Sequence, residues 1–362
     1  MNAASNARTR SIETNVPVIV ATSRTAGVSL AQGATDARDV VVSAVTAAEV
    51  SAQGNLVGTR VASTTGDVSV SSALGGVSVA NLSAARDLTV SAAGRVTTSS
   101  ATATRHATLT SSGTAAGGGG MTLPSVTAGG ALTISAAGAT SDSTLGSVTA
   151  RGGALTPSSG RHLTLTTGSA TGLASASAGG QLSLGSLTSS AGAVSASAGS
   201  TLGFTTLSAA TGLSATAAGA ITGNAASTRA GTAAITSTGG GVQLATVTGP
   251  AGIVVSGSGD VSLTSATASA GTLTATSSAG GLRYGTLSAR GVHLTSGGLL
   301  AATTPSTGVQ GGAITSTEVD PLDAIRVTAA QGQVSLGALT ATSGRVVVES
   351  TAGPLTTGNV TE

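Results

Sequence analysis

Apolar residues recur along this chain in a pattern that repeats about every twenty residues, which is the sequence signature of a solenoid. The pattern is clearest over residues 181–299, where one repeat carries its apolar residues at Leu182, Leu184, Leu187, Val194 and Ala196. Alternation within each short run is typical of β-strands. Stretches rich in Gly, Ser and Ala separate the runs and supply tight corners. Each repeat is therefore predicted to form one coil with two runs of strand.

Such a coil cannot bury its own apolar residues, but stacked coils place them in ladders that form one continuous core. We therefore predict an all-β protein, a single parallel β-helix of about 17 coils. Stacking would put Leu182 against Leu202 and Leu184 against Phe204. The coils are predicted to start at Val18, Val40, Leu56, Val77, Val96, Met121, Ser143, Leu163, Leu182, Leu202, Ile221, Val242, Val261, Leu282, Leu300, Val334 and Leu355.

The periodicity also predicts the domain organisation. Residues 1–15 do not fit the repeat and are expected to be a frayed or disordered segment. Residues 16–362 are expected to form one repeat domain with insertions near residues 111–120 and 304–323, where the spacing widens. An amphipathic helix competes with strand over residues 38–50, but the density of β-branched residues there favours strand.

Composition narrows the function classes. The chain has 362 residues, of which 8% are charged, and a mean hydropathy of +0.37 with no apolar run long enough for a membrane-spanning helix. It has no cysteine, and no basic segment followed by an apolar stretch marks an export signal. All 15 basic residues are arginine, yet the net charge is only +2. Clustered cations and stacking aromatics are missing, so nucleic acid is not an expected partner.

The histidines and aromatic residues are better explained by structure than by chemistry. His106, His162 and His293 lie on well-separated coils, so they cannot form a metal cluster by themselves and are predicted to be solvated surface residues. Phe204 and Tyr284 occupy the same inward position of the repeat as Leu184 and are predicted to fill the core. No cofactor or metal site is expected.

Acidic residues offer two further candidates. Asp67 and Asp87 lie on adjacent coils and would stack ~5 Å apart, close to the separation that a retaining glycosidase requires. A bare solenoid corner provides no cleft for a substrate, so no catalytic role is expected. Glu318, Asp320 and Asp323 lie in the second insertion, and this loop is the best single candidate for a partner or Ca²⁺ contact.

Two surface features remain. Small hydroxyl residues occupy the outward position of the second strand at Thr89, Thr108, Thr133, Ser195, Ser214 and Thr274. Ice-binding rods also carry threonine ladders, but as regular T-x-T pairs on one flat face, whereas here Ala, Val and His are mixed into the pattern, so ice binding is not expected. The second feature is a sparse basic edge, for which a solubilising corner that opposes end-to-end growth is favoured over a contact with acidic glycans. It consists of arginines that fall eight or nine residues after the start of their coils: Arg86, Arg105, Arg151, Arg229 and Arg290.

Two stretches, ARDLTVSAAGRVTTSSATATRHATLTSSG and VTAGGALTISAAGATSDSTLGSVTARGGALT, carry the pattern G-x-L-x-h-x-A-x-G-x-h, in which h is apolar. This pattern resembles the filamentous-haemagglutinin-type repeats of large bacterial exoproteins. The resemblance extends from about Val18 to the C-terminus. It implies a right-handed parallel β-helix, secretion through an outer-membrane partner, and adhesion to host or neighbouring cells. The N-P-N-L and N-P-N-G-I motifs of the family's secretion domain are missing from this sequence.

The sequence therefore favours a non-catalytic shaft of a secreted or cell-surface bacterial adhesin. Such a shaft would display loops and a Ser/Thr-rich face for attachment to cells, surfaces or glycans. The alternatives are a polysaccharide-degrading β-helix enzyme and a passive component of a surface layer or biofilm matrix. An enzyme on this fold needs charged side chains clustered in a groove between long loops, whereas this chain offers only two short insertions and no lysine.

Overall fold

The computed structural model describes residues 11–13, 18–24, 26–32, 36–115, 118–300, 307–317 and 323–361. These residues form an all-β structure in which parallel strands build a β-solenoid of about 16 turns with a period near 20 residues. The predicted fold class is thus confirmed, and residues 38–50 form two strands joined by a corner at residues 45–47 rather than a helix. The chain divides into two compact units, Met1–Gln181 and Leu182–Glu362, which we describe separately.

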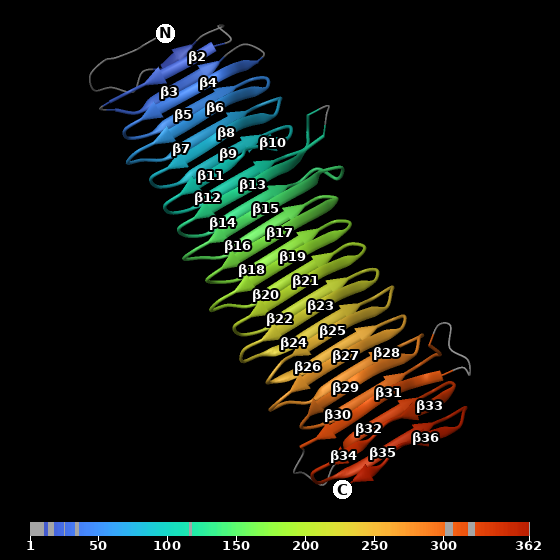
Figure 1. The fold of residues 1–362 in the computed structure, drawn as a ribbon. Helices are drawn as coiled ribbons and strands as arrows, with labels where there is room; N and C mark the ends of the chain where they lie inside the picture. Colours follow the sequence, from blue (N-terminus) through green and yellow to red (C-terminus); the bar gives the residue numbers. More distant parts are fainter. Residues whose placement is uncertain are drawn as a thin grey trace. The chain divides into compact units, whose positions relative to one another are not determined.

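Each turn contributes a long strand to one parallel sheet and a short strand to a second parallel sheet (Figure 1). The long strands of the first unit are β2 (Val18–Thr22), β4 (Ala37–Ala44), β6 (Leu56–Ser63), β8 (Val77–Ala84), β10 (Val96–Thr97) with β11 (Ser100–Ala103), β13 (Gly120–Ala128), β15 (Asp142–Ala150) and β17 (His162–Ala170). Its short strands are β1 (Ser11–Glu13), β3 (Val28–Gln32), β5 (Ala48–Ala52), β7 (Val68–Ser72), β9 (Leu88–Ala92), β12 (Ala107–Ser111), β14 (Leu132–Ala136), β16 (Leu155–Ser159) and β18 (Ala174–Ala178).

The second unit repeats this arrangement. Its long strands are β19 (Leu182–Ser189), β21 (Leu202–Ala209), β23 (Ile221–Thr228), β25 (Val242–Thr248), β27 (Val261–Ala268), β29 (Leu282–Ala289), β31 (Thr307–Ser316), β33 (Gln333–Leu336) with β34 (Leu339–Ala341), and β36 (Leu355–Thr357) with β37 (Val360–Thr361). Its short strands are β20 (Val194–Ala198), β22 (Leu213–Ala217), β24 (Thr232–Ser237), β26 (Gly252–Gly257), β28 (Leu273–Ser277), β30 (Val292–Ser296), β32 (Asp323–Ala329) and β35 (Arg345–Ser350).

Each long strand bends near its middle, where two successive residues face outward. In β21, Leu202, Phe204 and Leu207 are buried, whereas Thr205 and Thr206 point away from the core. The alternation resumes after the bend, so both halves of the strand supply residues to the same core. The apolar pattern of the sequence is the pattern of buried residues because side chains alternate across each half-strand.

The register between turns confirms the predicted ladders. Leu182 pairs with Leu202 and Leu184 pairs with Phe204, and all four side chains are at most 7% exposed. Backbone hydrogen bonds thus run from each turn to its neighbours, while like residues stack inside. This coupling makes the core continuous within each unit even though no single turn encloses one.

Two predicted coil starts are wrong. The turn assigned to Val40 starts at Ala37, which pairs with Leu56, because a bulge separates Ala37 from Val40. Asp39 in the bulge has a left-handed backbone with a φ of 51°. The turn assigned to Leu300 starts near Val309, which pairs with Leu282. The two leucines at residues 299–300 resembled a coil start in the sequence, but they lie before the long strand β31.

Two predicted irregular segments contain strands. Ser11–Glu13, within the segment expected to be frayed, forms β1 and pairs with β3 through Ile12 and Leu30. Backbone amides alone can make such a pairing, so a segment that breaks the side-chain repeat can still extend the sheet. Residues 307–316, assigned to the second insertion, form β31. The first predicted insertion corresponds to the connection between Ser111 and Gly120.

Candidate functional site

Two columns of hydroxyl side chains cover the outer face of six successive short strands in the first unit, after β5, which carries Glu49 in the first column. Along β7, β9, β12, β14, β16 and β18 every outward pair is a Ser or Thr at positions i and i+2, and we call this surface the hydroxyl face. Its residues are Ser69 with Ser71, Thr89 with Ser91, Thr108 with Thr110, Thr133 with Ser135, Thr156 with Ser158, and Ser175 with Ser177.

The columns are in register across the strands. Thr89, Thr108 and Thr133 pair in succession, as do Ser91, Thr110 and Ser135. Neighbouring strands of a sheet are ~4.8 Å apart and residues i and i+2 of a strand are ~6.6 Å apart. The hydroxyl face is therefore a two-dimensional array with a constant repeat in both directions.

The sequence predicted only one of these columns. The six outward Ser and Thr residues that it identified are exposed or half-exposed, as expected. The second column lies two residues further along each strand, and the register between strands was needed to show that both continue without a break. In the second unit, Ala234, Val254 and His293 interrupt the first column, while its neighbour continues through Thr236, Ser256 and Thr295.

A corner beside the hydroxyl face is organised by side-chain acceptors that the sequence did not identify. The Asp67 carboxylate accepts the backbone N–H of Asp87 at 3.0 Å, and the Asp87 carboxylate accepts that of His106 at 3.0 Å. His106 Nδ1 accepts the N–H of Ala131 at 3.0 Å. At the other end of the short strands, where the chain enters β17, His162 Nδ1 accepts the N–H of Gln181 at 3.1 Å. These histidines were predicted to be merely solvated, but each one links two turns.

Asp67 and Asp87, the carboxylates that the sequence predicted to stack on adjacent coils, each also lie near an arginine. Arg86 Nε lies 3.8 Å from Asp67, and Arg105 Nε lies 3.8 Å from Asp87. Each carboxylate therefore serves the backbone of the next turn and faces a guanidinium. Both are occupied by structural contacts, which supports a role in the stacking of turns.

Asp142 and Arg161 form the tightest ion pair of this unit that the structure shows. Arg161 Nε donates to Asp142 at 2.8 Å, and its second nitrogen donates to the other carboxylate oxygen. This hydrogen bond holds the pKa of Asp142 below its usual range, and the charges of Arg161 and His162 act in the same direction.

The predicted basic edge consists of arginines at one corner of each unit. The backbone N–H of Arg105 donates to the carbonyl of Arg86 at 3.0 Å, which places these two residues on adjacent turns of the first unit. In the second unit, Arg229 and Arg290 directly follow β23 and β29, one residue closer to the long strand than Arg86 and Arg105 are. Asp67 and Asp87 neutralise Arg86 and Arg105 in part, so the charge along this edge is uneven.

Arg151 instead lines a surface groove with a second arginine, Arg60, and we call this site the arginine groove. It crosses the outer halves of the long strands in the first unit and has a volume of about 540 Å³. Both guanidinium groups are exposed, and the described residues include no ion-pair partner for either. Between them the lining consists largely of small residues and hydroxyls, including Ser83, Thr102 and Thr127, which pair in one column.

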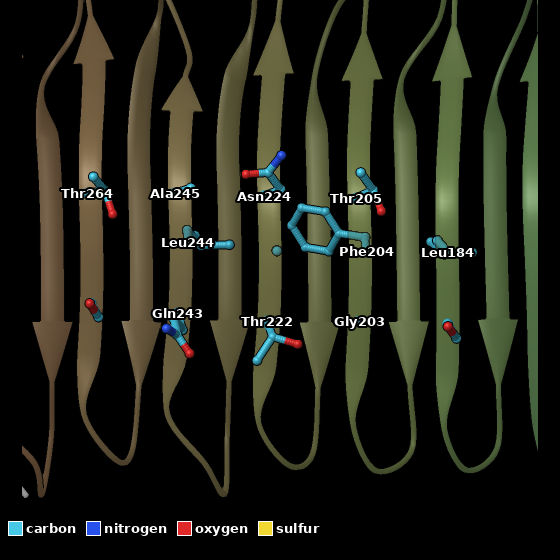
Figure 2. Close-up of a pocket in the computed structure, with 13 residues that line it drawn as sticks. Leu184, Gly203, Phe204, Thr205, Thr222, Asn224, Gln243, Leu244, Ala245 and Thr264 are labelled. Atoms are coloured by element: carbon cyan, nitrogen blue, oxygen red, sulfur yellow. The ribbon is translucent and has the colours of Figure 1, made fainter.

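The second unit has a groove of different chemistry, which we call the amide groove. Asn224, Gln243 and Thr222 lie along it, and its volume is about 500 Å³. Figure 2 shows the Phe204 ring reaching toward the strand that carries Thr222 and Asn224. Leu244 also lines this groove, so an apolar floor lies below polar rims.

Both aromatic residues fill core positions, as predicted, and each stacks on a glycine. Phe204 pairs with Gly223, where a Cβ atom would lie only 2.1 Å from the ring carbon Cζ. Tyr284 pairs with Gly311 in the same way, with a distance of 2.0 Å. The Tyr284 hydroxyl has no hydrogen-bond partner among the residues that the structure describes, and burial raises its pKa. Each glycine is required by the close approach of the ring.

Corner serines form another group that the sequence did not identify. Ser277 donates its hydroxyl to the Gly259 carbonyl at 2.8 Å and accepts the N–H of Gly280 at 3.1 Å. Ser72 makes the same two contacts in the first unit, with Gly54 and Gly75. Each of these buried hydroxyls closes its own corner and ties it to the turn before.

The acidic loop contributes no described site. Glu318 and Asp320 lie outside the described residues, and of Asp323 only the backbone, at the start of β32, is described. Elsewhere in the described ranges no group of three or more His, Asp or Glu side chains could hold a metal ion. The described part of the chain also contains no helix with the length and hydropathy needed to cross a membrane.

Comparison with known proteins gave no relatives: no family model, curated protein or solved structure matches this chain.

Proposed function

We propose that this chain is a non-catalytic shaft of a secreted or cell-surface bacterial adhesin. The solenoid presents the hydroxyl face for attachment to host cells, neighbouring cells or other surfaces, including their glycans. The resemblance to filamentous-haemagglutinin-type repeats supports the same assignment and implies an outer-membrane partner for secretion.

The observation that carries this proposal is the unbroken hydroxyl face of the first unit. Each Ser or Thr hydroxyl can both donate and accept a hydrogen bond, as can the hydroxyl groups of a sugar. A flat array of such groups makes many weak contacts at once, and many weak contacts on one rigid support give strong overall attachment. Nothing in the packing of the core requires these outward positions to be hydroxyls.

Attachment of protein-coated beads to bacterial and animal cells tests the proposal. In one variant, Thr89→Val, Thr108→Val, Thr110→Val and Thr133→Val remove four hydroxyls while keeping β-branched side chains. The matched control removes hydroxyls from the second unit with Thr236→Val, Thr274→Val, Thr276→Val and Thr295→Val. Beads with the first variant should detach several-fold faster than wild-type beads, and the control should behave as wild type. Equal attachment of all three would overturn the proposal.

The regular hydroxyl array favours a second candidate, the binding of ordered water at an ice surface. Its constant repeat in two directions is the property that such a surface would need, and the first unit has this regularity. Thermal hysteresis of the purified protein tests this function. A freezing-point gap that disappears in the four-valine variant would support it, whereas freezing at the melting point would exclude it.

The two other functions that the sequence left open make different predictions. A polysaccharide-degrading enzyme would release reducing ends from soluble polysaccharides, which the shaft should not do. A passive surface-layer or matrix component would leave cell attachment unchanged when the hydroxyls are removed.

A further inference from the structure

Charge is unevenly distributed on the outer surface of the first unit. Arg86 and Arg105 face carboxylates, but Arg60 and Arg151 have no such partner among the described residues. Both of these unpaired guanidinium groups line one groove. A guanidinium presents a planar fork of donors that fits a carboxylate or sulfate group. The arginine groove is therefore complementary to an anion at each of two places.

The separation of the two arginines indicates what kind of anion fits. Arg60 lies in β6 and Arg151 directly follows β15, and the strands β8, β11 and β13 lie between them. Four strand spacings correspond to ~19 Å along the stack of turns. One small anion cannot reach both guanidinium groups. An extended chain with acidic groups at intervals can do so.

The lining between the arginines indicates the rest of the ligand. Ser83, Thr102 and Thr127 form an in-register column of hydroxyls, and Thr64 and Thr104 add two more at the edge of the groove. These groups suit neutral, hydroxyl-bearing units between the acidic ones. A nucleic acid has a phosphate on every unit, and single strands bind through stacking on aromatic residues. The groove has no aromatic side chain in its lining.

We propose that the arginine groove binds an extended segment of an anionic polysaccharide, with Arg60 and Arg151 each holding an acidic group and the hydroxyl column contacting the sugars between. This inference rests on the proposed attachment function and names a partner for it. Carboxylated and sulfated polysaccharides share the required chemistry.

Binding of the full chain to immobilised alginate, dextran sulfate, neutral dextran and poly-dT tests the proposal at low and high salt. The test variant is Arg60→Gln with Arg151→Gln. The control, Arg283→Gln with Arg345→Gln, changes net charge equally at exposed positions of the second unit that line neither groove and lie outside the basic edge. A third variant, Arg60→Lys with Arg151→Lys, keeps the charge but loses the planar fork. Circular dichroism melts check that all variants are folded.

Wild type should bind at least one acidic polysaccharide and not neutral dextran, with affinity that falls as salt rises. Loss of one charge-assisted contact weakens binding roughly tenfold, so the test variant should lose on the order of a hundredfold. The control should lose less than about threefold, and the lysine variant should lie between. Alginate and dextran sulfate distinguish a carboxylate from a sulfate ligand.

Three results would overturn the inference: equal losses in the test and control variants, equal binding of neutral dextran, or stronger binding of poly-dT. The four-valine variant of the hydroxyl face separates this outcome from failure of the proposed function. If that variant loses cell attachment but still binds the acidic polysaccharide, the hydroxyl face is responsible for attachment and the arginine groove for polysaccharide binding. If the arginine variant alone loses polysaccharide binding and all proteins attach equally, the groove stands and the attachment proposal fails.

Discussion

The two units have the same backbone repeat but differ on their outer surfaces. In the first unit every outward pair from β7 to β18 is a hydroxyl pair, and the groove carries unpaired guanidinium groups. In the second unit Ala234, Val254 and His293 interrupt the same column, and the groove is neutral. Since β24, β26 and β30 keep the same parallel pairing with these residues, the solenoid does not require hydroxyls there. The regularity of the first unit therefore supports a role beyond folding.

The two units also differ in how their core positions are filled. In β13, β15 and β17 of the first unit, the second inward position holds Leu123, Leu145 and Leu165, which stack on one another. The second unit places a ring above a glycine at Phe204 and Tyr284. At these two places one turn contributes a large ring to the core and the next turn contributes only a glycine, so each turn depends on its neighbour for packing.

The largest expected effect on stability comes from changing the ring or the glycine of such a pair. Phe204→Ala leaves a cavity above Gly223 and should lower the free energy of unfolding by about 3–5 kcal/mol. Gly223→Ala should also destabilise, because its Cβ would lie 2.1 Å from the Phe204 ring. In the double variant the new methyl group occupies part of the cavity. Its cost, measured by denaturant unfolding, should therefore be smaller than the sum of the single costs by about 0.5–3 kcal/mol.

Gly203→Ala provides the matched control for the glycine substitution. The added Cβ would have its nearest neighbour at 3.8 Å, the Thr222 hydroxyl, so it fits without displacement. This variant should be within about 0.5 kcal/mol of wild type, as is usual for surface positions. Strict additivity of Phe204→Ala and Gly223→Ala would contradict the stacking of ring on glycine.

A smaller effect is expected at the corner of the first unit. His106→Leu removes the acceptor for the Ala131 N–H and should cost about 0.5–1.5 kcal/mol. His106→Asn should cost less, since Asn55 makes the same kind of bond to the Gly76 N–H at 2.9 Å. Unfolding midpoints of the two variants measure the difference. Leu173→Ala, at an equivalent exposed position without an acceptor, is the control and should change little. If His106→Leu is as stable as wild type, the histidine contact is dispensable.

The period and the inward residues could be predicted from the sequence because both depend on the alternation of apolar side chains. The start of a turn at Ala37 could not, since a bulge with a left-handed Asp39 moves Val40 out of the expected register. Val309 was missed for a similar reason, because the leucine pair at residues 299–300 offered a closer match to the repeat. Backbone pairing between strands sets the start of both turns, and the pattern of apolar residues does not specify this pairing.

The functional surfaces were predictable only in part. One hydroxyl column and Arg151 could be found by counting from the start of each coil. Arg60 could not be connected with Arg151, because they are many residues apart and share a groove only through the stacking of β6 to β15. The acceptor roles of Asp87 and His106 depend on side-chain direction at a corner, which strand periodicity does not specify. An outward polar residue just before a strand on successive coils is the signal that could have found them.

The smallest effect is expected at the ion pair of Asp142 and Arg161 in the first unit. Arg161 lowers the pKa of Asp142, so the pair contributes stability above the usual aspartate range and loses it as the pH falls through the lowered pKa. The two side chains are 41% and 49% exposed, and solvent screening keeps the contribution small. Asp142→Asn should therefore match wild type at a pH below the lowered pKa and be slightly less stable at pH 7. Arg161→Gln should cost the same, and the double variant no more than either, in unfolding curves at both pH values. A pH dependence that persists unchanged in Asp142→Asn would show that other carboxylates account for it.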